Sequence, residues 1–180
     1  MPSHPIEREP VIQPQDQTIR LIPLTQGHVV IVDAIDYECL SQWPWHVRTN
    51  KAGQSYAVRH ALASENGPRT ILMHRVILNS PKGRKVDHVN RCETLDNRRS
   101  NLRIADNFQS AWNRGPRSNN HSGYKGVCSR GDKWLAQLRI KGRTVLRKEF
   151  TTKEAAALAY NDAAKHYHGK FACLNEVKQP

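Results

Sequence analysis

The chain has 180 residues, and its 28 Lys and Arg against 16 Asp and Glu give a formal net charge of +12. Only 38% of the residues are hydrophobic, against about 45–50% in an average globular protein. This composition excludes a collagen-like or fully disordered chain and argues against one large apolar core, and the length fits one or two small domains. No apolar run approaches the roughly 20 residues of a membrane span, and the N-terminus has no signal-peptide pattern. We therefore expect a cytoplasmic protein.

The positive charge is concentrated in the last two thirds of the chain. The net charge is −1 over residues 1–60, +6 over 61–120 and +7 over 121–180. A charge that served only solubility would be spread evenly, whereas Lys and Arg that neutralise phosphates supply most of the non-specific affinity for nucleic acid. Nucleic acid is the first partner to consider, and an incidentally basic surface is the alternative.

The cysteines offer no metal or redox motif. They stand at positions 39, 92, 128 and 173 and form no Cys-x-x-Cys pair, which argues against a zinc ribbon or a thioredoxin-type site. We interpret them as small buried structural residues.

The first half of the chain alternates between short strands and helical turns. The polar residues 1–17, with four prolines, predict a loose tail. The elements expected after it are strands over 19–24 and 28–33, a helical segment over 33–40, a hairpin of 43–47 and 56–62, and a strand passing into a short helix over 71–78. Asp33 and Asp36 fit the electrostatics at the start of the helical segment.

The second half of the chain contains a basic linker rich in helix breakers, residues 115–121, which is expected to separate two domains. The elements expected on either side of it are a strand over 85–90 and a short helix over 106–113, then strands over 124–129, 133–141 and 143–150 and an alanine-rich helix over 155–167. Thr151 and Glu154 match a capping box at the start of that helix. Three antiparallel strands covered by one helix leave one face of the sheet uncovered.

Asp87 and His88 are adjacent at the end of a predicted strand. Because consecutive side chains of a strand point to opposite faces, one of them could hold a cation while the other activates a water. A neutral imidazole with a pKa near 6.5 suits a general base, and Mg²⁺ usually takes only one or two oxygen ligands from protein. The pair therefore has the chemistry for metal-assisted phosphodiester hydrolysis, although a lone Asp-His pair is more often a surface strand end.

The remaining histidines are interpreted as structural. His74 fits packing beside an apolar strand, and His166 and His168 lie near a helix C-terminus, where a cation is favourable. His46 and His60 have no partner at metal-ligand spacing.

Three segments, Met73 to Arg75, Val86 to Asn90 and Asp96 to Ile104, carry a resemblance to a known family. In this order they resemble HNH endonucleases of the phage and homing-endonuclease type. The resemblance implies an α+β fold in which a β-rich N-terminal region leads into a ββα-metal core, and it covers residues 18–114.

The resemblance also implies roles for single residues. Asp87 would be a metal ligand, His88 the general base, and Asn101 the asparagine that braces the hairpin loop and orients His88. The family usually has a second ligand, His or Asn, at the position of Ser110, and Asn113 one helical turn later could substitute for it. The implied ion is Mg²⁺ or Mn²⁺.

A second candidate surface is the predicted C-terminal sheet. Strand alternation places Gln137, Arg139 and Lys141 on one face and Leu138 and Ile140 on the other. A β-ribbon fits the DNA major groove, where Arg reads guanine and Gln reads adenine. Three further residues are expected to extend this polar face: Lys125, Arg130 and Trp134. Merely solvating charges are the alternative.

Residues 122–176 resemble the Apetala-two, or ethylene-response-factor, type of DNA-binding domain. The matching segments include Ser122 to Val127, Lys133 to Gln137 and Phe150 to Ala156. The resemblance implies that the sheet enters the major groove of double-stranded DNA. Cys128 and Leu146 stand where the plant domains commonly have Arg and Trp.

The sequence thus predicts a site-selecting DNA endonuclease with no membrane partner and no obligate protein partner, in the cytoplasm of a bacterium or a phage-infected cell. The competing hypothesis is a weakened or inactive HNH relative that acts as a DNA-binding or regulatory protein, which Ser110 favours. An RNA-binding protein is a third interpretation, but the sequence lacks the exposed aromatic stacking pairs expected of that function.

Overall fold

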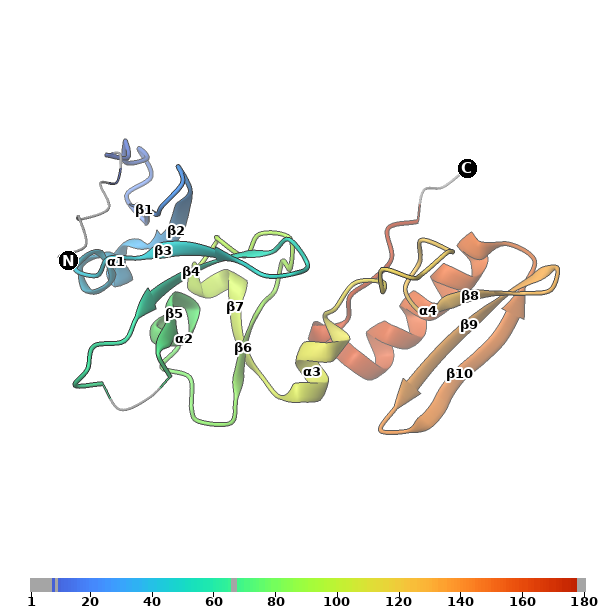
Figure 1. The fold of residues 1–180 in the computed structure, drawn as a ribbon. Helices are drawn as coiled ribbons and strands as arrows, with labels where there is room; N and C mark the ends of the chain where they lie inside the picture. The colour runs from blue at the N-terminus through green and yellow to red at the C-terminus, as the bar shows by residue number, and fades with distance from the viewer. Residues whose placement is uncertain (1–7, 9, 66–67, 178–180) are drawn as a thin grey trace. The chain divides into compact units, whose positions relative to one another are not determined.

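The computed structural model describes residues 8, 10–65 and 68–177. The chain divides into two compact units, residues 1–107 and 108–180. The architecture is mixed α+β with small antiparallel sheets, as predicted (Figure 1). Within the described residues, no helix combines the length and the apolar character that a membrane span requires.

The first unit begins with a hairpin of β1 (Ile19–Pro23) and β2 (Val29–Asp33), which are paired antiparallel and followed by α1 (Ala34–Ser41). Val30 and Val32 are fully buried because alternate residues of β2 face the core. Part of the predicted tail lies outside the described residues. The described part is attached to β1, since the Gln13 amide bonds both the N–H and the carbonyl of Leu21.

A second sheet of the first unit has the order β3 (His46–Thr49), β4 (Ser55–His60) and β5 (Thr70–Leu72), and α2 (Met73–Ile77) follows directly. The strand that passes into a helix is therefore confirmed. The core between the two sheets and these helices is built from large buried side chains, the bulkiest of which is Trp45.

A short hairpin of β6 (Lys85–His88) and β7 (Leu102–Ala105) completes the first unit. Asp87 is paired in register with Arg103, and His88 with Leu102. The loop between the strands ends in the 3₁₀ turn η1 (Arg99–Asn101) and touches β2 through a parallel bridge between Ile31 and Asp96. This loop carries most of the candidate site.

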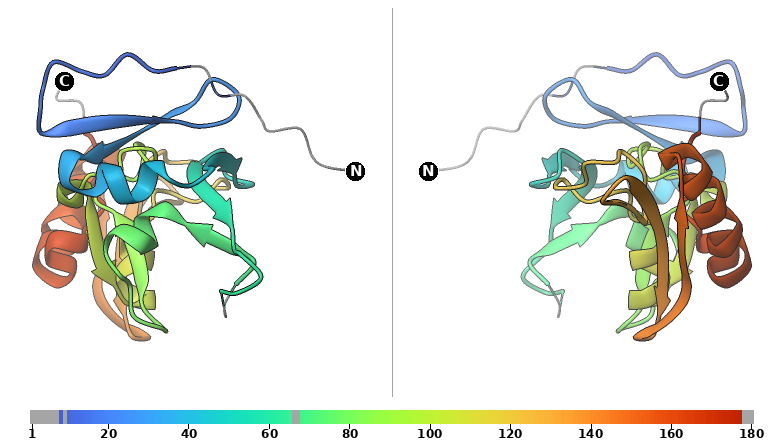
Figure 2. Two further views of the ribbon diagram at one scale, coloured as in Figure 1. Left: turned by 90° about the vertical axis from the view of Figure 1, so that its left-hand side faces the viewer. Right: turned by 90° about the vertical axis from the view of Figure 1, so that its right-hand side faces the viewer.

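The second unit contains a three-stranded antiparallel sheet in the order β10 (Arg143–Phe150), β9 (Lys133–Ile140), β8 (Val127–Arg130). The helix α4 (Lys153–His168) lies along one face of it and is followed by η2 (Gly169–Phe171) (Figures 1 and 2). Ala156, Ala157 and Ala164 are fully buried, and their small side chains let the helix approach the sheet closely. The predicted arrangement of three strands and one helix is thus present.

The start of α4 differs in detail from the expected capping box. The helix is capped by Thr152, whose hydroxyl accepts a hydrogen bond from the N–H of Ala155 at 3.2 Å. The prediction named Thr151, one residue earlier. Both threonines precede Glu154, so the sequence marks the helix start but not which hydroxyl turns toward it.

The division between the units falls at the start of α3 (Asn107–Trp112), whereas the sequence placed a linker after this helix, at 115–121. In the second unit the Trp112 ring stacks on His168 of α4, with 4.5 Å between ring centroids. Burial, with Lys125 nearby, lowers the pKa of His168 to about 4. His168 is therefore neutral at pH 7, and the expected cationic helix end is wrong at this residue.

The cysteines are less buried than expected. Cys39 and Cys92 are exposed, and Cys128 and Cys173 are half-buried. Cys39 lies on the outer side of α1 and Cys92 lies in the loop after β6, so neither fills a core position.

Replacing Gly126 by alanine is expected to destabilise the second unit by about 2–4 kcal/mol. Gly126 has φ +75°, and an added Cβ would lie 2.1 Å from the buried ring of Tyr160. Gly123→Ala is the matched control, because Gly123 has φ +79° with nothing within 4 Å of the added atom. Urea unfolding of both variants measures the difference, and equal losses would contradict the steric argument.

Candidate functional site

His88 is the most enclosed of the predicted site residues. It ends β6 and is only 5% exposed, because the strand turns it toward the interior while Asp87 points the other way. Burial lowers the pKa of His88, and Asn97, Asp87 and Asp96 partly oppose this shift. The imidazole is therefore neutral at pH 7, which is the form a general base requires.

The hydrogen-bond partner of the His88 ring is Asn97. His88 Nε2 lies 2.8 Å from Asn97 Oδ1, and Asn97 is completely buried. The residue pattern around Asn97 gives no sign of its burial, because its neighbours in the segment 96–99 are charged and no periodicity marks it as internal.

Two further rings surround His88. The His74 ring meets it edge-on with 5.0 Å between centroids, and Tyr56 lies 5.9 Å from His88 and 5.8 Å from His74. Because His74 lies in the first turn of α2 and Tyr56 belongs to β4, elements distant in sequence form this aromatic cluster. His74 packs as predicted, and it packs against the candidate base itself.

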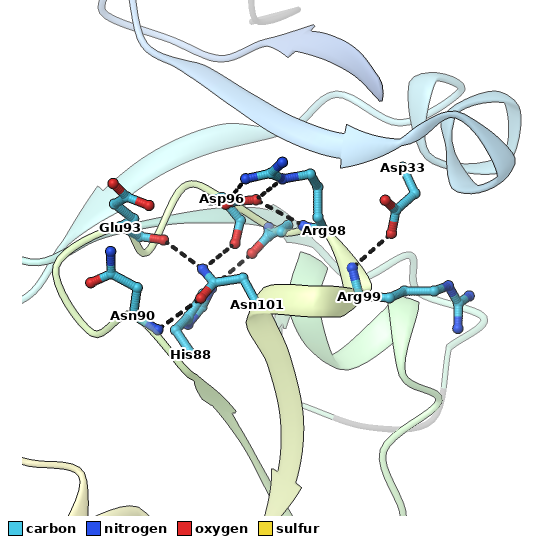
Figure 3. A network of polar contacts seen from close by, with 9 residues as sticks. Asp33, His88, Asn90, Glu93, Asp96, Arg98, Arg99 and Asn101 are labelled. Carbon is cyan, nitrogen blue, oxygen red and sulfur yellow. Dashed lines mark hydrogen bonds and ion pairs between the residues drawn. The ribbon is translucent and has the colours of Figure 1, made fainter. Parts of the chain in front are cut away.

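Asn101 acts on the loop and not on the ring of His88. Its Oδ1 accepts a hydrogen bond from the N–H of Asn90 at 2.8 Å, and its Nδ2 donates to the carbonyls of Glu93 and Asp96 (Figure 3). One amide therefore closes both sides of the loop that follows β6.

The same loop is attached to the N-terminal hairpin. Asp33 accepts a 2.7 Å hydrogen bond from the backbone N–H of Arg99, and Asp36 forms an ion pair with the Arg99 side chain (Figure 3 shows Asp33 and Arg99). Asp33 makes no side-chain cap on α1. The interpretation of these carboxylates as helix-end electrostatics is thus incomplete, because their partner lies more than sixty residues away.

Asp87 faces Arg103 across the hairpin. Its Oδ2 accepts hydrogen bonds from Arg103 Nε at 3.1 Å and Nη2 at 2.9 Å, and both side chains are largely buried. A carboxylate oxygen is a hard ligand suited to Mg²⁺ or Mn²⁺. The donor chemistry of Asp87 therefore fits the implied ion, with Arg103 holding the carboxylate in place.

The other predicted ligands lie on the second unit. Ser110 is on α3 and Asn113 follows that helix, where Asn113 is buried. Their participation in a metal site with Asp87 stays a prediction. In the described ranges no group of three or more His, Cys, Asp or Glu side chains is arranged to hold a metal ion.

The outer face of the C-terminal sheet gathers several of the predicted DNA-binding side chains. Arg130, Gln137 and Arg139 share the face that α4 does not cover, and Arg130 forms an ion pair with Glu149. Arg147 is exposed directly opposite Gln137, and Lys133 directly opposite Arg130. Arg147 and Lys133 were not among the predicted contacts, although the alternation along β9 and β10 places both on this face.

Three predicted contacts lie elsewhere. Trp134 packs against the buried cluster under α4, because it has the same strand parity as Ala136 and Leu138. Lys125 lies in the loop before β8, and its ammonium group donates to the carbonyl of Trp112. Lys141 lies in the turn after β9 with φ 45°, where it is exposed. Trp134 and Lys125 therefore do not extend the face of Gln137, which corrects the prediction.

Acid is expected to destabilise the first unit through His74. Burial, with His88 and Arg75 nearby, lowers the pKa of His74 to about 3, against about 6.5 in an unfolded chain. The unfolded chain therefore binds the proton first, so stability is lost as the pH falls below about 6.5, by a few kcal/mol near pH 4.

Urea unfolding of the wild type and of His74→Phe at pH 7 and at about pH 4 isolates this effect from the titration of carboxylates. The variant keeps a ring but has no titrating nitrogen, so its stability is expected to fall less with acid. An equal fall in both proteins would contradict the prediction.

Comparison with known proteins finds a distant relative. The chain is 28% identical over 152 residues to a protein of Acanthamoeba polyphaga mimivirus named "Uncharacterized HNH endonuclease L560". The match covers 84% of this chain and 77% of that protein. No family model and no solved structure matches the chain.

Proposed function

We propose that the chain is a divalent-metal-dependent DNA endonuclease of the HNH type. The observation that carries the proposal is the arrangement at the end of β6, where a neutral His88 is held by Asn97 and the adjacent Asp87 carboxylate is held by Arg103. These are a candidate base and a candidate metal ligand on neighbouring residues. The name of the mimivirus relative supports the same class of activity.

In this proposal His88 takes a proton from a water molecule, whose oxygen attacks the phosphorus of the scissile phosphodiester. The bond from phosphorus to the leaving oxygen breaks, and that oxygen receives a proton from solvent. A divalent ion bound to Asp87 would stabilise the negative charge that develops on the phosphate. Asn97 holds the imidazole, and Asn101 holds the loop that surrounds it.

Cleavage of plasmid DNA tests this function. Wild-type protein is expected to convert supercoiled plasmid to nicked or linear forms with Mg²⁺ or Mn²⁺, and EDTA is expected to stop the reaction. Cleavage that persists in EDTA would contradict metal dependence, and the absence of cleavage with either ion would contradict the nuclease assignment.

We further propose that the second unit binds double-stranded DNA through the outer face of its sheet, in the manner of an Apetala-two domain. The exposed residues Arg139, Arg147 and Gln137 support this, since they lie side by side on β9 and β10. A two- or three-stranded ribbon of this kind matches the width of the major groove.

Removing one of these arginines is expected to weaken DNA binding. Arg147→Ala should lower the slope of log affinity against log salt by about 1 if it contacts a phosphate, or relax base preference if it contacts a base. Lys165→Ala on the exposed side of α4 removes the same charge and is the matched control. Fluorescence anisotropy over a range of salt concentrations measures both, and equal behaviour of the two variants would exclude the sheet as the binding surface.

The second candidate function is DNA binding without cleavage. Two observations favour it, namely the ion pair that Arg103 already forms with Asp87 and the serine at position 110. If this second function is correct, the chain binds DNA with a steep salt dependence and leaves the plasmid intact with every divalent ion.

A further inference from the structure

The two asparagines near His88 contact different groups. Asn97 is the one whose side chain meets the imidazole, through Oδ1 at 2.8 Å from Nε2. The Asn101 side chain hydrogen-bonds backbone groups of the loop, namely the N–H of Asn90 and the carbonyls of Glu93 and Asp96. Holding the ring and bracing the loop are therefore separable tasks.

Only the oxygen of the Asn97 side-chain amide forms a hydrogen bond within the described part of the chain. Its Nδ2 is buried and has no hydrogen-bond partner within the described part of the chain, while its Oδ1 faces His88. A buried donor without a partner destabilises the folded state. A leucine of similar size would avoid the unpaired donor. The presence of an asparagine at this position is therefore explained by the hydrogen bond between its oxygen and His88.

The backbone around Asn97 is fixed by the hairpin core. The N–H of Asn97 donates to the carbonyl of Ile31 at 2.8 Å, and the N–H of Ile31 donates to the carbonyl of Leu95 at 3.0 Å. Ile31 lies on β2 between Val30 and Val32, which are both fully buried. The backbone that carries the amide oxygen is thus held against a buried strand by two hydrogen bonds.

We propose that Asn97 is the positioning residue of His88 and that its oxygen, 2.8 Å from Nε2, fixes the tautomer of the neutral ring. An acceptor beside Nε2 requires the hydrogen of the neutral ring to be on Nε2, which leaves the lone pair on Nδ1. This inference rests on the proposed nuclease function and assigns a task within it.

Asn97→Leu and Asn97→Asp test the inference in the full chain. The leucine removes the acceptor, so kcat for plasmid cleavage is expected to fall at least about tenfold, and by no more than the roughly 10²–10⁴ that the positioned base itself contributes. The KM for DNA is expected to stay within about twofold, because a fully buried residue makes no DNA contact. The aspartate keeps an acceptor and is expected to recover a large part of kcat.

Thr94→Val is the matched control for loss of a buried hydrogen bond. Thr94 is buried in the same loop, and its hydroxyl donates to the carbonyl of Ser55 and does not contact His88. Its Tm is expected to fall while kcat stays near that of the wild type. A drop in kcat equal to that of Asn97→Leu would show that any loosening of the loop has this effect, and it would overturn the inference.

The imidazole spectrum decides the question independently of cleavage. In ¹⁵N-labelled wild type, the His88 resonances, assigned by their absence from His88→Gln, are expected to show a protonated Nε2 and an unprotonated Nδ1 at pH 7. Asn97→Leu is expected to lose this fixed tautomer, and Asn97→Asp to keep it. An unchanged His88 spectrum in Asn97→Leu would overturn the inference. If the wild type cleaves no DNA, the proposed function fails, and the spectrum alone shows whether Asn97 holds the ring.

Discussion

Replacing His88 by alanine is expected to lower kcat for DNA cleavage by about 10²–10⁴, the contribution of a positioned general base. The ring is 5% exposed and enclosed by Asn97, His74 and Tyr56, so its loss removes the proton acceptor without removing a charged group from the surface. DNA affinity is therefore expected to change little. Nicking rates of supercoiled plasmid under saturating Mg²⁺ measure the first quantity, and anisotropy titrations measure the second.

His60→Ala is the control for this substitution. His60 is an exposed histidine on β4 of the same unit, where its ring stacks on His46 at 5.1 Å and does not contact His88. Its cleavage rate is expected to match that of the wild type. Equal nicking by His88→Ala and the wild type would exclude His88 as the base, whatever the effect on DNA binding.

Replacing Trp45 by alanine is expected to destabilise the first unit by about 3–5 kcal/mol. Trp45 is fully buried, its Nε1 donates to the carbonyl of Leu40 at 2.7 Å, and its carbonyl accepts a hydrogen bond from Arg8. The substitution creates a large cavity and leaves the Leu40 carbonyl without this donor. A loss of this size is a large fraction of the stability of a typical small domain.

Urea unfolding followed by circular dichroism measures the loss, and Trp45→Phe separates its two causes. Phenylalanine fills most of the cavity but lacks the indole N–H, so it is expected to cost about 1–3 kcal/mol through the unpaired Leu40 carbonyl. A free energy of unfolding for Trp45→Ala within about 1 kcal/mol of the wild type would contradict the placement of Trp45 at the centre of the core.

The elements of this protein follow from short-range patterns. Each pattern depends on residues that are close in sequence. The structure has the alternation in β2 and β9, the apolar strand that runs into α2 and the alanine-rich α4. The two halves of the β6–β7 hairpin were less evident, because β7 carries Arg103 and an exposed Ile104 and has little apolar periodicity. The same alternation also separates Trp134 from Gln137, so strand geometry alone excludes this tryptophan from the polar face.

The sequence by itself determined the α+β class, the three strands and covering helix of the C-terminal half, and the adjacency of a carboxylate and an imidazole at positions 87 and 88. These properties depend on neighbouring residues, whose relation a strand or helix geometry dictates. Only the tertiary structure decided that Asn97 meets His88, that Arg99 is held by Asp33 and Asp36, and that His74 and Tyr56 pack around the candidate base. Those contacts join separate elements, and a hydrogen bond between residues many positions apart leaves no periodic trace in the sequence, because its geometry exists only once the core has brought the two segments together.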